Sequence, residues 1–541
     1  MKMKSISPIF KPISVGIDFG TFKSAIAYWA LGKKGPELVI VRPEDKEDPY
    51  QSRSLPTRIS LSNHNDGGFY MILDNGQFQE RPDEKGVYVA HNFKKYFLDE
   101  AWPESEQKQI EATLQRPVSL VALAGKVIDT LNTSLVFEIK RNYIRARTKN
   151  YVITVPPRWK YRQKRATLKA AELSGIKNVR LIDEPLAAAV FLMKTGIFNP
   201  TKSSVSLVID FGAGTFDVAL LEMKESGIKV TYKDTEPFGG TDIDKALLEK
   251  IVSRKENSEY SYNRKVLKRS GKVVNHQVYI TILDKITTLK HSFSEPAKST
   301  QKRHARASIL DATVTLEEFR EVVTDELKRI RVFLTKFLSP FPAQSKQIDH
   351  VFLVGGSSKL LDFDKFIEET LKPITTQQQP RIIKPENPEW CIVKGAAYLS
   401  ASDARPDFMI EADNIPQIDF NKNELSLLSG SLPSTEKKEL PQGGILIFKV
   451  LQDIPKVEIK IFADGNNETS DIVTIVPLHE NVFRKDCRIS IEYEVGTDSL
   501  IRFKSEVLYP RQKIVLRHKV YELDKDDSLL QHEYRISGGT R

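Results

Sequence analysis

The strongest constraint on this chain is a motif that occurs twice. Residues 14–21 (SVGIDFGT) and 207–217 (LVIDFGAGTFD) each read as a short apolar strand followed by Asp, an aromatic residue, a glycine-containing turn and Thr. A second apolar stretch follows each turn, at residues 25–30 and 216–223. We therefore predict two glycine-tipped β-hairpins. They lie too far apart for a solenoid repeat, which indicates two duplicated halves of one large domain.

The segments around the hairpins alternate between predicted strands and helices. Residues 151–156 (YVITVP) predict a strand, residues 163–175 a helix, and residues 178–183 the next strand. A long amphipathic helix is predicted at residues 315–338. Residues 350–363 read as a buried strand, a glycine-rich turn and the start of a helix. This alternation predicts the α/β class.

After residue 407 the pattern changes to short strands separated by turn signals. Residues 488–495 (RISIEYEV) alternate between apolar and polar side chains, which is typical of a half-buried strand. We therefore predict a first domain over residues 1–402, a polar linker over residues 403–408 and an antiparallel β-rich domain over residues 409–541.

Composition and charge exclude several classes of protein. The net charge of +10 is modest for 541 residues, and the basic runs at 254–272 and 298–306 read as solvated surface, so no nucleic acid is expected as a partner. Cys391 and Cys487 lie too far apart in sequence to indicate a zinc site or a disulfide framework. Without a signal-peptide pattern or a long apolar run, we expect a cytoplasmic protein that does not span a membrane.

The repeated motif has the chemistry of a phosphate clamp. An Asp at a strand end beside a glycine turn places a carboxylate next to backbone N–H groups that can approach an anion. Thr21 and Thr215 add hydroxyl donors, and Asp18 and Asp210 would hold Mg²⁺ through its water shell. Residues 354–358 (VGGSS) form a third element, in which a glycine pair can lie against a flat ligand.

These three elements, in this order, resemble the ATPase domain of the actin-like superfamily. More narrowly, the sequence resembles the seventy-kilodalton heat-shock chaperone family of the DnaK type, and residues 151–190 carry that similarity almost without interruption. The resemblance extends over residues 13–400. It implies a duplicated ATPase domain with ATP or ADP and Mg²⁺ in a central cleft, followed by an antiparallel β-sandwich.

The resemblance also implies roles for individual residues. Lys94, Glu184, Asp210 and Thr215 match the catalytic positions, with Lys94 placing a cation near the transferred phosphate. Pro156, Lys164 and Arg180 match positions that relay the nucleotide state. The nucleotide-binding positions of the family are matched by Asp18, Gly20, Thr21, Gly212, Gly214, Asp217, Gly239, Gly240, Lys290, Ser294, Gly355, Gly356, Ser357 and Glu389.

Some positions depart from the family pattern. Phe22 replaces a second hydroxyl residue, and Ala213 replaces the central glycine of the second loop, so each change removes something from the phosphate clamp. Thr287 and His291 stand where the family offers Glu and Arg to adenosine, and Leu361 replaces a Pro. We therefore expect ATP binding with slow hydrolysis.

The sequence favours two functions. The first is an ATP-binding, chaperone-like Mg-dependent ATPase whose β-rich domain, expected to have no helical lid, binds unfolded or extended protein segments. The resemblance implies a J-domain co-chaperone and a nucleotide-exchange factor as its partners. The second is an ATP-sensing scaffold or regulator with little hydrolysis and one fixed protein partner. A small-molecule kinase and a filament-forming actin relative are weaker alternatives, because neither explains the β-rich domain.

Overall fold

The computed structural model describes most of the chain in separate segments. They are residues 13–30, 33–41, 53–63, 69–73, 87–97, 102–142, 149–176, 179–200, 203–253, 276–294, 306–309, 312–341, 347–375, 379–400, 409–410, 417–430, 442–462, 471–477, 482–495, 501–509 and 514–519. The predicted linker (403–408) lies outside these residues, as do most of the two basic runs.

The first half of the chain builds a sheet around the first predicted hairpin. Strand β1 (Ile13–Asp18) pairs antiparallel with β2 (Lys23–Ala30) and parallel with β8 (Lys149–Val155), which pairs parallel with β9 (Val179–Asp183). Short strands β3 (Glu37–Leu38) and β4 (Leu55–Pro56) pair with β2. The first hairpin and both strands that follow it are therefore confirmed.

The second half repeats this arrangement. Strand β10 (Ser204–Phe211) pairs antiparallel with β11 (Phe216–Lys224) and parallel with β15 (His350–Val354). The sheet order is β16-β15-β10-β11-β12-β17, with β12 at Gly227–Glu236, β16 at Arg381–Ile383 and β17 at Met409–Ile410. Because each half joins an antiparallel hairpin to a parallel neighbour, the pairing supports the duplication read from the sequence.

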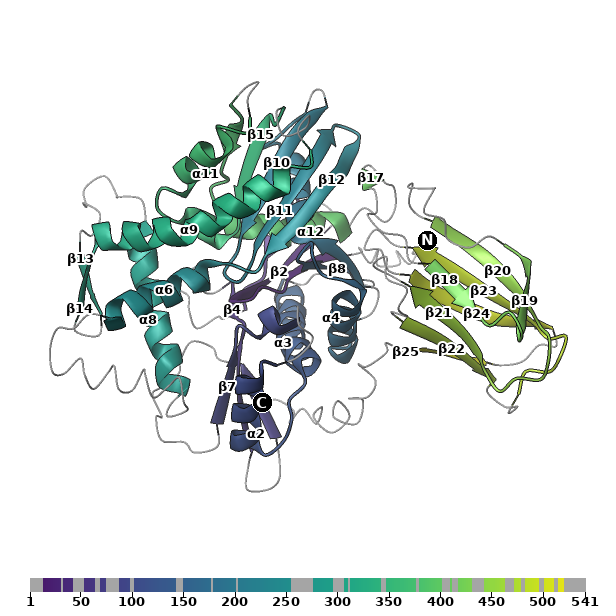
Figure 1. Cartoon of the computed structure of the whole chain (residues 1–541). Helices are drawn as coiled ribbons and strands as arrows, with labels where there is room; N and C mark the ends of the chain where they lie inside the picture. Colours follow the sequence, from purple (N-terminus) through teal and green to yellow (C-terminus); the bar gives the residue numbers. More distant parts are fainter. Residues whose placement is uncertain are drawn as a thin grey trace, which may run out of the picture.

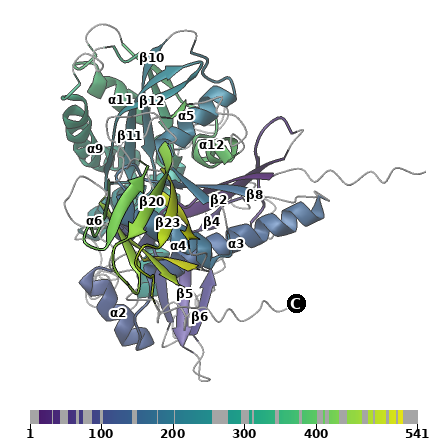
Figure 2. The same cartoon turned by 90° about the vertical axis from the view of Figure 1, so that its right-hand side faces the viewer.

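Two helices pack against each other beside the sheets (Figure 2). Helix α5 (Glu184–Lys194) begins at the end of β9, and helix α12 (Cys391–Ser400) contacts it. A Cβ placed on Gly395 would lie 1.8 Å from the carbonyl oxygen of Ala187, so the two helices approach at a distance that only glycine permits at this position.

The remaining helices follow the expected amphipathic pattern. Helix α9 (Leu316–Leu338) matches the predicted long helix and begins with a capping box between Thr315 and Glu318. The other helices are η1 (Phe93–Phe97), α2 (Glu104–Leu114), α3 (Leu120–Arg141), α4 (Tyr161–Leu173), α6 (Gly240–Ser253), α8 (His276–Ser294), η2 (Gly356–Lys359), α11 (Phe363–Leu371) and η3 (Pro388–Trp390).

Two small sheets complete this part of the molecule. One has the order β6-β5-β7, with β5 at Arg58–Asn63, β6 at Phe69–Leu73 and β7 at Val87–His91. The other pairs β13 (Arg306–Ile309) with β14 (Ala312–Thr315).

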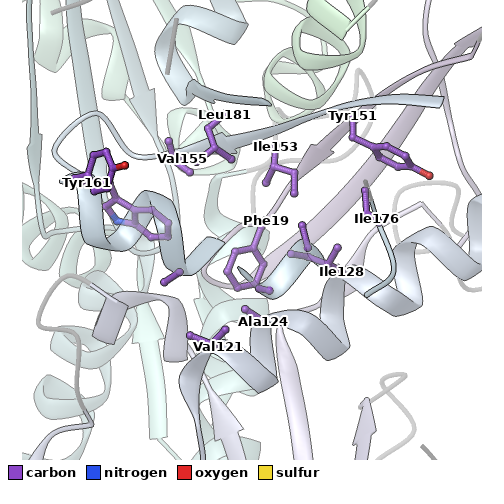
Figure 3. Close-up of a cluster of buried hydrophobic side chains, with 14 of the residues drawn as sticks. Phe19, Val121, Ala124, Ile128, Tyr151, Ile153, Val155, Tyr161, Ile176 and Leu181 are labelled. Atoms are coloured by element: carbon purple, nitrogen blue, oxygen red, sulfur yellow. The ribbon is translucent and has the colours of Figure 1, made fainter. Parts of the chain in front are cut away.

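The hydrophobic core of the first half lies between its large sheet and helices α3 and α4. Phe19, Ile128 and Ile153 meet there with other apolar side chains (Figure 3). Within the described residues, α3 is the one helix long and apolar enough to cross a membrane by length and composition, and 56% of its most apolar window is buried inside the protein. Its burial is that of a core helix.

The C-terminal strands form two antiparallel sheets, which lie together at one side of the molecule (Figures 1 and 2). In one sheet the order is β18-β21-β22-β25, with β18 at Gln417–Phe420, β21 at Val457–Phe462, β22 at Asp471–Pro477 and β25 at Ile514–Lys519. In the other it is β19-β20-β23-β24, with β19 at Leu425–Ser429, β20 at Gln442–Val450, β23 at Arg488–Val495 and β24 at Ile501–Tyr509.

The expected α/β content with several sheets is confirmed. Strand β17 departs from the expected domain limits, because Met409 and Ile410 pair with Gly227 and Ile228 of β12 rather than with the C-terminal sheets. The domain limits otherwise stay a prediction.

Candidate functional site

The turn between β10 and β11 gathers buried polar groups. The strand register places Asp210 directly opposite Asp217. The hydroxyl of Thr215 donates to Asp217 Oδ2 at 2.6 Å, and the hydroxyl of Thr235 on β12 donates to Asp217 Oδ1, also at 2.6 Å. Both hydrogen bonds favour the ionised carboxylate, although the site is almost closed to water.

Three carboxylates of this region lie close enough to share one cation. Ligand oxygens of Glu184, Asp210 and Asp217 all lie within 4.8 Å of one another. Within the described residues, Asp210 Oδ1 is buried and has no hydrogen-bond partner. Burial and the neighbouring carboxylates raise the pKa of Asp210 and Asp217 well above the ordinary value. A hard divalent cation such as Mg²⁺, which prefers oxygen ligands, fits this donor set.

A lysine meets these carboxylates from the first half. The Nζ of Lys94, on η1, donates to Glu184 Oε1 at 2.6 Å, and both side chains are buried. Burial opposes the charge of Lys94, but Glu184 and Asp18 outweigh it and hold the pKa of the lysine above its ordinary value. The ammonium group therefore stays charged beside the carboxylates.

The first loop reaches the same region with a different environment. Asp18 is only partly buried and accepts a hydrogen bond from Thr154 at 3.1 Å. Burial and the charge of Glu184 raise the pKa of Asp18 to about 7. The backbone of Gly20 accepts a hydrogen bond from Thr57 at 2.8 Å. Asp18 does not belong to the group of three carboxylates described above, whereas Asp210 does.

The two loops touch each other. A Cβ placed on Gly214 would lie 2.5 Å from Thr21 Oγ1, so no larger residue fits at this contact without displacement. The structure thus brings together Asp18, Thr21, Lys94 and Glu184 from the first half with Asp210, Gly214, Thr215 and Asp217 from the second.

Several of the predicted nucleotide-binding residues meet at the start of α6. The backbone N–H of Gly240 donates to the carbonyl oxygen of Gly212 at 3.1 Å, and Ser357 Oγ donates to the same oxygen at 2.8 Å. Lys290 Nζ donates to the carbonyl of Gly240 at 2.7 Å and to Asp244 at 2.9 Å. A Cβ on Gly239 would lie 2.3 Å from the carbonyl oxygen of Ala213.

The Gly355–Gly356 turn is shaped for close approach. Gly355 has φ +81°, and a Cβ there would lie 2.2 Å from Asp210 Oδ1, so glycine is required. Gly356 faces open space. The sequence places a helix directly behind this turn, but the structure inserts the short η2 before α11 begins at Phe363.

Two of the predicted nucleotide-binding residues, Glu389 and Ser294, already have partners within the protein. Glu389 pairs with Lys359 at 2.7 Å through Oε1, while its buried Oε2 makes no hydrogen bond within the described residues. Ser294 donates to the carbonyl of Lys290 on its own helix at 2.9 Å.

The departures from the family pattern change the electrostatics of this region. Thr287 donates to Asp244 at 2.9 Å, in support of the buried Lys290–Asp244 ion pair. His291 lies at an exposed position of α8, where partial desolvation and the charge of Lys290 lower the pKa of its imidazole, so the ring is neutral at physiological pH. The adenine base of a bound nucleotide would therefore meet the neutral His291 ring where the family offers the cation of an Arg.

Sequence reasoning missed several polar residues of the site. Asp242 and Asp244 follow Gly239–Gly240 at the start of α6, and this sequence of two glycines and two aspartates was the available signal. Thr154 and Thr235 gave no signal, because an isolated Thr in a strand is common.

The predicted relay residues lie directly after β8, on α4 and on β9. Pro156 precedes Arg158, whose backbone N–H donates to Thr235 Oγ1 at 3.2 Å across the two halves. Arg180 donates to the carbonyl of Leu399 at 3.0 Å, and Lys164 is buried on α4.

Comparison of the amino-acid sequence with those of known proteins shows which family it matches. The family model described as "Hsp70 protein" matches residues 106–408. The chain is similar to "Chaperone protein DnaK" of Deinococcus deserti and of Deinococcus proteolyticus, at 25% identity over 396 residues in both cases. Each alignment covers 71% of this chain and 58% of the relative, so the chain matches less than two thirds of their length.

Proposed function

The chain belongs to the Hsp70 protein family, and from this membership and the site geometry we propose that it is an ATP-binding, chaperone-like protein that hydrolyses ATP slowly. The observation that carries the proposal is the convergence of Lys94 with Glu184, Asp210 and Asp217 beside two glycine turns. A cation, several carboxylates and glycine turns that let the backbone approach an anion are the parts that phosphoryl transfer uses.

The residues divide the work of the proposed reaction. Gly20, Gly212 and Gly214 allow the backbone to approach the phosphates, and Thr21 and Thr215 offer hydroxyl groups. Lys94 supplies a fixed positive charge where negative charge develops in the transition state, and Glu184 keeps that lysine charged and in place.

The carboxylates fit the cation that such a reaction needs. Asp210 and Asp217, with Glu184 beside them, would hold Mg²⁺ directly or through its water shell, and Asp18 would add a ligand from the first loop. Mg²⁺ neutralises phosphate charge when it is bound. Asp210 Oδ1 is buried and has no hydrogen-bond partner among the residues that the structure describes, so it is available to such a ligand.

We assign binding of extended protein segments to the C-terminal sheets. They expose apolar side chains such as Leu428 and Ile445, which can contact an apolar segment. The proposal includes a cytoplasmic location, a β-sandwich arrangement of these sheets, and a J-domain co-chaperone and a nucleotide-exchange factor as partners. A polar linker at residues 403–408 would couple these sheets only weakly to nucleotide state, because it offers little apolar area to bury.

Single-turnover ATP hydrolysis, measured with and without an unfolded apolar peptide, tests the proposal. We expect slow turnover above the protein-free background, and release of bound peptide that changes by less than about tenfold between ATP and ADP. ATP binding without turnover would instead favour the sensor function, in which Phe22 and Ala213 have weakened the phosphate clamp. Absence of Mg-dependent ATP binding would contradict both functions.

A further inference from the structure

Two consecutive lysines of η1 form ion pairs with opposite halves of the molecule. Lys94 Nζ lies 2.6 Å from Glu184 Oε1, at the start of α5 in the first half. Lys95 Nζ lies 2.9 Å from Asp242 Oδ2 and 3.2 Å from Asp242 Oδ1, at the start of α6 in the second half. A helix of five residues therefore connects the proposed catalytic pair with the other half of the chain.

Asp242 is itself fixed to the second phosphate loop. Its Oδ2 accepts the backbone N–H of Gly239 at 2.8 Å. The next residues, Gly240 and Thr241, donate their backbone N–H groups to the carbonyls of Gly212 and Ala213 at 3.1 and 2.9 Å. The carboxylate that Lys95 contacts thus moves with the backbone that would surround the phosphates.

The surroundings of η1 make this contact consequential. Phe93 and Phe97 anchor the helix in the core, and Phe97 stacks on Trp159 with ring centroids 5.5 Å apart. One turn of 3₁₀ helix has weaker internal hydrogen bonds than an α-helix, so the ion pairs of Lys94 and Lys95 contribute to its orientation together with the two phenylalanines. Lys95 and Asp242 are 20% and 25% exposed, so their attraction is screened less than that of a surface pair.

We propose that Lys95 is a positioning residue whose ion pair with Asp242 couples the approach of the two halves to the placement of Lys94 at the transferred phosphate. The proposal rests on the ATPase function proposed above. When the halves approach, Asp242 draws Lys95 and thereby η1 toward the second loop; when they separate, η1 loses this contact. The rate of hydrolysis then depends on the approach of the two halves. The Lys95–Asp242 ion pair transmits this dependence, although neither residue contacts the nucleotide.

Four variants test the proposal. Lys95→Met and Asp242→Asn each remove the ion pair, and Asn can still accept the N–H of Gly239. The double variant tests whether the two residues act through one interaction. Lys95→Arg keeps the positive charge and serves as the conservative variant. Lys108→Met is the control, because Lys108 lies on α2 and its ion pair with Glu104 is exposed.

We expect each single variant to lower the single-turnover rate about tenfold and the ATP affinity by less than about threefold, because misplacement of a reacting group acts on the chemical step. The double variant should be no slower than the singles, because residues that share one interaction are not additive. Lys95→Arg should recover most of the rate. Additive losses, an equal loss of affinity, or failure of the Arg variant to recover the rate would overturn the proposal.

Hydrogen exchange of residues 93–97 in the presence of Mg²⁺ and ATP provides a readout independent of turnover. Lys95→Met and Asp242→Asn should speed exchange in this segment and leave α9 unchanged, whereas unchanged exchange at residues 93–97 would contradict the proposal. A wild-type chain without turnover would contradict the proposed hydrolysis, and exchange alone would then decide whether Lys95 positions η1.

Discussion

The two phosphate loops have nearly the same sequence and unequal surroundings. In the first hairpin, Asp18 stands opposite Ala25; in the second, Asp210 stands opposite Asp217. Asp18 is partly exposed and hydrogen-bonded to Thr154, whereas Asp210 is buried and has an oxygen without a partner within the described residues. The second hairpin therefore carries two buried acids where the first carries one acid and an alanine.

This difference indicates a division of labour between the duplicated halves. The second half supplies Asp210 and Asp217, and the first half supplies Lys94 together with Glu184. These three acids, with Asp18 near them, repel one another, and one lysine offsets only part of that repulsion. A divalent cation would offset the remainder, which explains why buried carboxylates are tolerated here.

The largest effect should come from Lys94, the positively charged side chain that the first half contributes to the site. Lys94→Met should lower ATP turnover by about 10²-fold with a much smaller loss of ATP affinity, because a preorganised charge acts mainly on the transition state. Single-turnover kinetics measure the rate, and titration calorimetry measures the affinity. The double variant Lys94→Met with Glu184→Gln also removes the Glu184 charge that loses its ion-pair partner, and so controls for destabilisation. Equal losses of affinity and rate would assign Lys94 to binding rather than catalysis.

The hydroxyl groups of the two loops should differ in importance. Thr215→Val removes a hydrogen bond to the charged Asp217 and should slow turnover by roughly 10–100-fold, in line with 1.5–3 kcal/mol for such a bond. Thr21→Val keeps the contact with Gly214 and should cost less. Parallel rate measurements on both variants compare the loops directly. A larger loss at Thr21 would reverse the assignment.

The raised pKa of Asp18 predicts a dependence of stability on pH. Its ordinary value is 3.8 and its folded value is about 7, so between these pH values the folded protein retains a proton that the unfolded chain has released. In the absence of nucleotide and divalent cation, the carboxyl group of Asp18 therefore makes the free energy of unfolding fall as the pH rises from about 4 to 7. Asp18→Asn should reduce that fall in thermal unfolding at pH 5, 6, 7 and 8.

The exposed Asp325 provides the control for this pH series. The hydrogen bond from Lys328 lowers the pKa of Asp325, so Asp325→Asn should leave the decline between pH 5 and 8 intact. A decline of equal steepness in Asp18→Asn would show that Asp18 does not hold the proton, and would place the effect on the acids of the second loop.

The smallest effect concerns the second loop's departure from the family pattern. Ala213→Gly removes a methyl group from a turn that should approach phosphate, and we expect turnover to rise by about threefold at most. The rate is measured by single-turnover kinetics beside Phe22→Thr, which restores a hydroxyl to the first loop. A decrease in both variants would show that the site depends on Phe22 and Ala213.

Local patterns predicted much of this architecture. Strand–turn–strand periodicity gave both hairpins, and the amphipathic pattern with Thr315 gave α9 almost to the residue. The site residues on the hairpins followed from their spacing, because an Asp at a strand end and a Thr beyond the turn must lie close together.

Contacts between distant segments could not be predicted in this way. Lys95 and Asp242 are 147 residues apart, and neither an adjacent lysine nor an aspartate at a helix start indicates a specific partner. The pairing of Met409 with β12 was missed for the same reason, since a two-residue strand has no periodicity. Register also decided the role of Asp217, because only the pairing places it opposite Asp210.

Calorimetric titration of ATP into the wild-type chain, Asp210→Asn and Asp18→Asn, each with and without Mg²⁺, tests the division between the two loops most directly. We predict that Mg²⁺ strengthens wild-type binding and that Asp210→Asn loses most of this gain, about tenfold or more, because a charged interaction worth roughly 1.5–3 kcal/mol is removed. Asp18→Asn should retain a larger part. Two results would contradict the assignment of Mg²⁺ mainly to the carboxylates of the second half. One is an equal ATP affinity in all conditions, and the other is a greater loss of the Mg²⁺-dependent gain in Asp18→Asn than in Asp210→Asn.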